Sequence, residues 1–284
     1  MPEDASKYSK TLFLREMKIK TVILAILFIV VLWSLTEPYL IQVDNITVAD
    51  KGIPKSFNGK RIVYISDMHC GWTFSTDRVE SLVNRVNILK PDIIILGGDY
   101  IWGRSGNIGE CTQPYANLKA PLGLYAVLGN HDNWADRLKT IESLKSAQAV
   151  VLDNDARWIE SGGSRIHIGG VGDLWTEEQD IAPTLDGVGA DDYVILVSHN
   201  PMYVKRLPDD SVDLMLSGHT HGGQIILMRL FAPYLPSRLR QTYMSGVYSV
   251  DGTELIVSNG IGTVFAPVRF MAPPQITVIT LKSA

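Results

Sequence analysis

Five short apolar segments of this 284-residue chain each run directly into a polar tip that contains aspartate, asparagine or histidine. The segments with their tips are RIVYISDMH at 61–69, DIIILGGD at 92–99, GLYAVLGNHD at 123–132, YVILVSHN at 193–200 and VDLMLSGHTHGG at 212–223. Short apolar runs between turn residues are typical of buried strands. In open α/β sheets the functional crevice lies at the carboxyl ends of the strands, so we expect the five tips to converge on one place.

The segments between the first strands have helical periodicity. Residues 78–90 place apolar side chains on one helix face, residues 134–148 have the same period, and residues 111–119 are compatible with a short helix. Strand, polar loop and helix in alternation predict an α/β layer with mostly parallel strands. The second half has shorter strands, a hairpin over 243–260 turning at Asp251-Gly252, and a last strand at 275–281. We therefore expect one domain of two packed sheets flanked by helices.

The N-terminus contains an uncharged apolar run from Thr21 to Leu35, preceded by five basic residues. A retained signal-anchor is the favoured interpretation, with the basic flank in the cytoplasm and the rest of the chain beyond the inner membrane. A cleaved signal peptide and a buried core helix are the alternatives. The predicted organisation is a basic N-terminus (1–20), a transmembrane segment (21–41), a linker (42–59) and one domain (60–284). The linker segment is typical of a short strand followed by turn-rich sequence.

Charge and cysteine content argue against a nucleic-acid partner and against a disulfide framework. The net charge is −4 and the body of the chain has no basic tract, so no nucleic-acid partner is expected. Two cysteines, Cys70 and Cys111, predict no disulfide framework. Cys70 follows His69 directly and is interpreted as a small filler of space near the tips rather than a nucleophile.

The polar tips have the side chains of a metal site. Five of the six histidines lie in them, and the sixth, His167, is expected to be an ordinary surface residue of a strand. Imidazole and carboxylate groups suit Zn, Fe or Mn. The candidate ligands are Asp67, His69, Asp99, Asn130, His199, His219 and His221. Seven ligands are too many for one tetrahedral ion but suit two ions that share a carboxylate.

In this order, D-x-H, GD, GNHD, a lone His and GHTH resemble the signature of the calcineurin-like metallophosphoesterases, from about Lys60 to the C-terminus. GHTHGGQ and the closing GIGT, PVRF and PPQITVITL are similar to the membrane-associated bacterial branch. The resemblance implies a four-layer α/β/β/α sandwich with a dinuclear centre. It implies one metal at Asp67, His69, Asp99 and His221, and another at Asp99, Asn130, His199 and His219.

The sequence departs from the family pattern at two places. An acidic residue often follows the GD, where this chain has Tyr100, Ile101 and Trp102. A basic residue often precedes the glycine at 260, where this chain has Asn259, so no phosphate contact is carried over to that position.

The predicted reaction is hydrolysis of a phosphodiester or pyrophosphate by two divalent cations (Mn, Zn, Fe or Co) that activate a bridging hydroxide. His131 is the candidate proton donor to the leaving group. Asp132 is expected either to orient His131 or simply to cap a helix N-terminus. Phosphodiesters are favoured over monoesters.

The substrate is expected to be lipid-linked or part of the cell envelope. The basic and aromatic stretch at 229–243 supplies Arg229, Arg238 and Arg240 as candidate substrate-binding residues, unless it is only a solvated loop. A UDP-2,3-diacylglucosamine-type pyrophosphate hydrolase, a non-enzymatic metal-binding scaffold and a metal-dependent nuclease are the alternatives.

Overall fold

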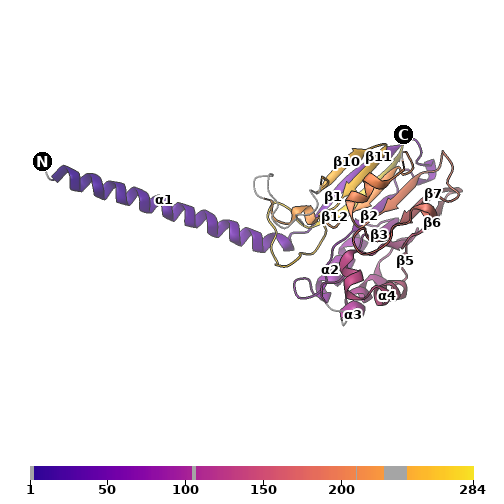
Figure 1. The fold of residues 1–284 in the computed structure, drawn as a ribbon, viewed down its shortest axis with the longest axis horizontal. Helices are drawn as coiled ribbons and strands as arrows, with labels where there is room; N and C mark the ends of the chain where they lie inside the picture. The colour runs from indigo at the N-terminus through magenta and orange to yellow at the C-terminus, as the bar shows by residue number, and fades with distance from the viewer. Residues whose placement is uncertain (1–2, 104–106, 209, 227–241) are drawn as a thin grey trace.

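Two mixed sheets of six strands each form the centre of the computed structural model, which describes residues 3–103, 107–208, 210–226 and 242–284 (Figure 1). The first sheet has the order β1 (Gln42–Asp50), β12 (Gln275–Ser283), β2 (Arg61–Ile65), β3 (Ile93–Leu96), β4 (Leu124–Ala126) and β5 (Val150–Val151). The second has the order β10 (Gly246–Val250), β11 (Thr253–Val257), β9 (Leu214–Ser217), β8 (Val194–Val197), β7 (Ser164–Gly170) and β6 (Asp155–Ser161).

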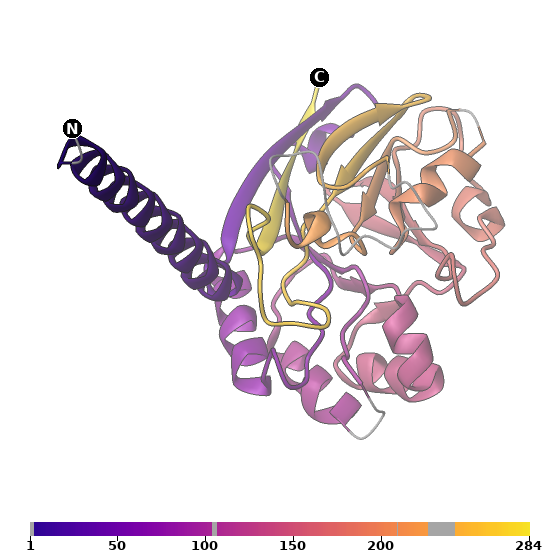
Figure 2. The same ribbon diagram turned by 60° about the vertical axis from the view of Figure 1, so that its left-hand side comes forward.

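The helices lie outside the two sheets. The α-helices are α1 (Glu3–Thr36), α2 (Thr76–Ile88), α3 (Ile108–Thr112), α4 (Asn130–Ser146) and α5 (Ala182–Leu185). Short 3-10 turns are η1 (Glu37–Tyr39), η2 (Lys55–Phe57), η4 (Gln113–Asn117), η5 (Pro201–Arg206) and η6 (His221–Gly223). Figure 2 shows α2, α3 and α4, coloured purple to pink, grouped on one side of the sheets.

Side chains alternate between the two faces of the strands, and the buried apolar ones form three clusters. Val63 and Ile65 of β2 face the helices and belong to the same buried cluster as Leu82 of α2. Their neighbours Ile62 and Tyr64 point to the other face, into the cluster between the two sheets. A third cluster lies between the second sheet and η5. Side chains of a strand alternate between its two faces, so these clusters confirm the predicted four-layer α/β/β/α arrangement.

The short strand expected in the segment 42–59 is β1, and it belongs to the first sheet of the domain. β1 pairs in parallel with β12 over nine residues, from Gln42 beside Gln275 to Asp50 beside Ser283. β1 is an edge strand on which Val48 is the only fully buried residue, so its sequence is mostly polar. Edge strands commonly carry polar side chains, and for that reason this segment resembled a linker.

The helix α1 projects away from the sheets (Figures 1 and 2). Its stretch Phe13–Tyr39 is long and apolar enough to cross a membrane, with a mean hydropathy of 2.4. None of its most apolar window is buried against the domain. A core helix would be buried, so that alternative is wrong, and the helix suggests a single-pass membrane anchor.

Two further expectations are corrected by the fold. Cys70 and Cys111 form a disulfide that joins the loop after β2 to α3, although 41 positions separate them in sequence. His167 is buried rather than exposed: its ring stacks on Trp158 at 4.3 Å between centroids, and its Nδ1 donates to the carbonyl of Thr184 at 2.9 Å. Both corrections depend on tertiary neighbours that a linear pattern does not contain.

Candidate metal centre

The seven predicted ligand residues come from the ends of five strands that share one edge of the sandwich. Asp67 and His69 follow β2, Asp99 follows β3 and Asn130 follows β4, all in the first sheet. His199 follows β8, and the pair His219 and His221 follows β9, in the second sheet. The structure therefore brings together tips that are up to 154 positions apart (67 to 221) in one buried cluster.

Distances within the cluster divide it into two groups. In the first, the Nε2 atom of His221 lies 3.0 Å from Nε2 of His69 and 3.5 Å from Oδ1 of Asp67. In the second, Nε2 of His199 lies 3.2 Å from Oδ2 of Asp99 and 3.3 Å from Nδ1 of His219. The same Oδ2 of Asp99 lies 3.5 Å from Nε2 of His69, so Asp99 stands between the two groups.

The protonation states of the imidazoles suit cation binding. Burial lowers the pKa of His69 and of His219 to about 3, and lowers the pKa of His221 well below its usual value. These rings are therefore neutral near pH 7 and each keeps a nitrogen lone pair. Burial alone would also lower the pKa of His199, but the carboxylates of Asp99 and Asp67 outweigh it and raise that pKa well above 6.5. A cation would replace that proton.

The amide of Asn130 gives an independent test of fit. Its Oδ1 atom is buried and has no hydrogen-bond donor among the residues that the structure describes. A buried carbonyl without a donor costs about 1–3 kcal/mol, and a divalent cation would remove that cost. The donor set of imidazole nitrogens, carboxylates and one amide oxygen matches first-row divalent metals. The residues present therefore fit two such ions.

Groups outside the cluster orient the ligands. The Nδ1 atom of His199 lies 2.8 Å from the carbonyl of Gly97, which can only accept, so Nδ1 carries the proton and Nε2 faces Asp99. The backbone N–H of His219 donates to both carboxylate oxygens of Asp67, and that of His131 donates to Oδ1 of Asp99. Such outer contacts are what align metal ligands.

The backbone at the strand tips is strained. Positive φ angles between 47° and 68° occur at five of the seven predicted ligands: Asp67, His69, Asp99, His219 and His221. Each non-glycine residue in this left-handed region costs about 1–3 kcal/mol, and such residues gather at functional sites. The fold tolerates this cost only because the surrounding hydrogen bonds and packing hold the tips in place.

Gly218 leaves the space that the Asp67 carboxylate occupies. A Cβ at Gly218 would overlap Asp67 Oδ2 and Oγ of Ser66. We expect Gly218→Ala to displace the carboxylate and lower kcat/KM by about 10–100-fold, as disturbed ligand orientation does. Gly109→Ala is the matched control, because a Cβ there meets nothing within 4 Å and, as at Gly218, the backbone φ is not positive. Equal activity of both variants would contradict the steric role, and thermal melting should show both folded.

Of the two roles predicted for Asp132, the structure supports the capping role. Its carboxylate accepts hydrogen bonds from the backbone N–H groups of Gly129, Asp99 and Tyr100 at 2.7–2.9 Å. It thereby closes the first turn of α4 and fastens the loop after β3 to it. No hydrogen bond from His131 to Asp132 occurs within the described ranges, so the proposed orienting role toward His131 is not supported.

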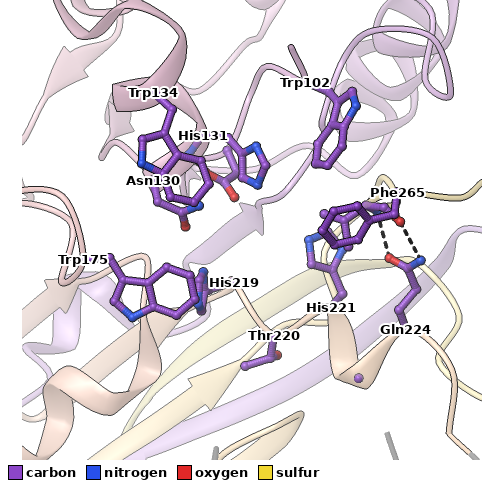
Figure 3. Close-up of a pocket in the computed structure, with 13 residues that line it drawn as sticks. Trp102, Asn130, His131, Trp134, Trp175, His219, Thr220, His221, Gln224 and Phe265 are labelled. Carbon is purple, nitrogen blue, oxygen red and sulfur yellow. Dashed lines mark hydrogen bonds between the residues drawn. The ribbon is translucent and has the colours of Figure 1, made fainter. Parts of the chain in front are cut away.

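A cavity of about 230 Å³ opens over the cluster. Its floor includes Asp99, Asn130, His219 and His221, and His131 lies in its wall. Figure 3 shows Trp134 and Trp175 on one side of His131, and Trp102 and Phe265 on the other. The His131 ring stacks on Trp102 at 4.7 Å and meets Trp134 edge-on at 4.9 Å. The cavity is therefore a metal-ligand floor surrounded by an aromatic rim.

Sequence reasoning missed this aromatic rim. A usable signal existed, since three of the six tryptophans lie within three positions after a polar tip: Trp72, Trp102 and Trp134. Trp102 and Trp134 belong to the rim. The predicted substrate-binding residues Arg229, Arg238 and Arg240 lie outside the described residues. Asn259, the departure noted from the family pattern, donates from Nδ2 to the carbonyl of Pro273 and packs against Gly222.

Sequence comparison agrees with the geometry. The model of the calcineurin-like phosphoesterase family matches residues 60–223. The chain is 35% identical to an uncharacterized metallophosphoesterase of Aquifex aeolicus, over 90% of this chain and 98% of that one. It is 28% identical to the phosphodiesterase YaeI of Escherichia coli, over 78% and 82% of the two chains. It is 30% identical to a bovine transmembrane protein with a metallophosphoesterase domain, over 85% of this chain and 57% of that protein. With its cluster of histidine and aspartate side chains at five strand ends, the chain belongs to the calcineurin-like phosphoesterase family of metal-dependent phosphoester hydrolases.

Proposed function

We propose that the protein hydrolyses a phosphodiester or pyrophosphate bond at two divalent ions. One ion is assigned to Asp67, His69, Asp99 and His221, and the other to Asp99, Asn130, His199 and His219. The observation that carries this proposal is the division of the cluster into two groups with Asp99 between them. Mn, Zn, Fe and Co all suit this donor set.

The ions, when bound, supply a water of lowered pKa and neutralise charge on the phosphoryl group. The chain's own residues hold the ions and handle the leaving group. His131 lies in the cavity wall above the ligands, where the oxygen of a leaving group would lie. Burial lowers the pKa of His131, so the neutral ring acts there by donating a hydrogen bond to that oxygen.

Two observations favour a diester over a monoester. Among the described residues that line the cavity there is no lysine or arginine, so none of these side chains would meet the extra charge of a monoester. The aromatic rim suits a second, uncharged substituent on phosphorus. The relative YaeI bears the name phosphodiesterase, which agrees with this choice.

We place the catalytic domain on the extracytoplasmic side of the inner membrane. Lys18 and Lys20 precede the apolar helix, and positive flanks stay in the cytoplasm. The disulfide between Cys70 and Cys111 supports the same side, because disulfides persist in oxidising compartments. An envelope or lipid-linked phosphodiester is therefore the proposed substrate class, with a UDP-diacylglucosamine-type pyrophosphate as the alternative.

The test uses the full chain in detergent, stripped with chelator and reloaded with Mn, Zn, Fe or Co. We expect turnover of bis(p-nitrophenyl) phosphate that depends on added metal, and much slower turnover of p-nitrophenyl phosphate. Metal analysis should find two ions per chain. Faster monoester hydrolysis would overturn the diester assignment, and no turnover with any metal would leave the scaffold alternative.

The role of His131 makes a separate prediction. His131→Ala should lower kcat by about 10²–10⁴-fold on a diester with a poorly leaving alkyl alcohol, because proton or hydrogen-bond donation matters most there. The loss on a p-nitrophenyl diester should be small, since that group leaves without help. His167→Ala, a buried histidine outside the cavity, serves as the control. Equal losses on both substrates would contradict the assignment.

A further inference from the structure

The C-terminal end of α1 is hydrogen-bonded to the loop of residues 263–272 rather than joined to the domain by a flexible linker. The buried carboxylate of Glu37 accepts from the backbone N–H groups of Met271 and Ala272 at 3.1 and 2.7 Å, and from Nε1 of Trp33 at 2.5 Å. The carbonyl of Ser34 accepts from the N–H of Arg269 at 2.9 Å. The last turn of the apolar helix is therefore part of the domain (Figure 2).

A second contact fixes the same junction from the side of α2. Nη2 of Arg78 donates to the carbonyl of Pro38 at 2.7 Å. The Arg78 guanidinium lies 4.5 Å from the ring centroid of Tyr39 and 4.3 Å from that of Phe74. Helix and domain are thus held in one orientation.

The length of the apolar run determines where the membrane surface meets the domain. Thr21 to Leu35 is fifteen residues, which span about 22 Å as a helix, whereas the hydrocarbon layer is about 30 Å thick. Lys20 limits the run at its N-terminal end. The outer boundary of the hydrocarbon therefore falls at or beyond Leu35, where Ser34 and Glu37 already bind the domain.

Exposed apolar side chains occur in the segments that form this junction and directly beside them in sequence, including Trp72, whose neighbour Thr73 accepts a hydrogen bond from Arg78 through its carbonyl. Trp72 is 67% exposed, Phe265 68% and Met271 53%, and Tyr39 and Leu40 are also exposed. We call these five residues the interfacial patch. Trp and Tyr are the residues that favour the headgroup level of a bilayer, and an apolar patch next to a membrane span is unlike isolated exposed residues elsewhere on the surface.

The interfacial patch continues into the cavity over the metal ligands. Phe265 lines that cavity and meets Trp102 edge-on at 5.6 Å. Gln224, three residues after His221, exchanges two hydrogen bonds with Val264, at 2.8 and 2.9 Å (Figure 3). The loop that holds α1 therefore also forms one wall of the cavity.

We propose that the interfacial patch rests in the headgroup layer and opens the cavity directly onto it, so that the substrate is a phosphodiester whose apolar part stays in the bilayer. The docking of the patch follows from the junction and the helix length. The substrate class rests in addition on the proposed function. Because the two parts have different supports, they are tested separately.

Docking is tested with the full chain in nanodiscs of phosphatidylcholine and phosphatidylglycerol, with and without dibrominated phosphatidylcholine. The contribution of Trp72 to the tryptophan emission is the difference between the wild type and Trp72→Phe. This contribution should be at least about twofold weaker in the brominated discs than in the unbrominated ones, as expected for an interfacial ring. The emission lost in Trp158→Phe, on the far strand β6, should be unchanged. Equal behaviour of the two signals would overturn the docking, whether or not the protein is active.

The substrate class is tested with Met271→Asp, which alters the patch but not the residues lining the cavity. Its control is Leu138→Asp, 72% exposed on α4. The probes are a diacylglyceryl methylumbelliferyl phosphodiester in the same nanodiscs and soluble bis(p-nitrophenyl) phosphate. We expect Met271→Asp to lower kcat/KM about tenfold for the lipid diester only, because a buried charge weakens interfacial docking. Leu138→Asp should affect neither.

Each other outcome has a defined meaning. A wild-type protein that cleaves the soluble diester but not the lipid diester would overturn the substrate class and leave the proposed function standing. Unchanged cleavage of the lipid diester by Met271→Asp would also overturn the substrate class. Failure on both diesters with every metal would reject the proposed function itself, while the quenching experiment would still decide the docking.

Discussion

Asp99→Asn should abolish turnover, with kcat at least about 10³-fold below wild type, which exceeds the 10–100-fold typical of an outer contact to a metal ligand. The Oδ2 atom of Asp99 lies between the two groups of ligands, 3.5 Å from His69 and 3.2 Å from His199. The Oδ1 atom of Asp67 is farther from the second group, at 3.9 Å from His199. An amide has one ligand oxygen and no charge, so it cannot neutralise two cations. The bound metal should therefore fall from two ions per chain to one or fewer, as measured by elemental analysis after gel filtration.

Asp213→Asn is the matched control for Asp99→Asn. Asp213 is a half-buried aspartate that accepts from the N–H of Val194 near the opposite end of β8. It should keep both ions and near wild-type kcat. Two bound ions in Asp99→Asn, or metal loss in the control, would contradict the assignment of Asp99 as the shared ligand. Asp99→Asn should remain folded, because from the part of the chain that the structure describes the Asp99 side chain accepts one backbone hydrogen bond, from His131.

The strand tips were predictable because each combines two local signals. An apolar run such as IIIL must be buried as a strand, and the glycine and charged residues after it, as in Gly98-Asp99, cannot continue it. Parallel neighbours bring such tips to one edge. For the same reason the hairpin of β10 and β11 was predictable, since Asp251 and Gly252, with φ of 45° and 83°, are residues that tolerate a tight turn.

The features that sequence reasoning missed depend on partners far along the chain. Cys70 meets Cys111 only because α3 packs beside the loop after β2. His167 is buried only because Trp158 crosses over it from the neighbouring strand. None of these pairings leaves a periodic trace in the sequence.

Arg269 is the most consequential of the missed residues. Its side chain is fully buried, a rare state for arginine, and burial lowers the pKa of its guanidinium to about 10, so it stays charged. The guanidinium donates hydrogen bonds to backbone carbonyls at five positions: His221, Asn259, Gly260, Gly262 and Ala272. It therefore joins the second histidine of the GHTH tip to the connection between β11 and β12.

Arg269→Met should destabilise the domain by at least about 4 kcal/mol, because it leaves several buried carbonyls without donors at about 1–3 kcal/mol each. For a domain of this size that corresponds to a fall in Tm of roughly 10 °C. The stability of Arg269→Lys should lie between those of the wild type and Arg269→Met, since a lysine keeps the charge but lacks the planar fork of donors. Arg165→Met is the control: its guanidinium lies 3.6 Å from the Trp158 ring at an exposed position of β7, and its loss should cost less than about 1 kcal/mol.

The Arg269 variants also separate stability from metal binding. Gly260 packs against Asp67, and the carbonyl of His221 is one of the acceptors of Arg269. At temperatures where Arg269→Lys is folded, we therefore expect it to bind metal about 10–100-fold more weakly than wild type, which is the usual effect of losing an outer contact to a metal ligand. Metal titrations followed by activity and by calorimetry would show this. If Arg269→Met melted like wild type, the five carbonyls would have other donors. If Arg269→Lys kept full metal affinity, Arg269 would stabilise the loops without positioning His221.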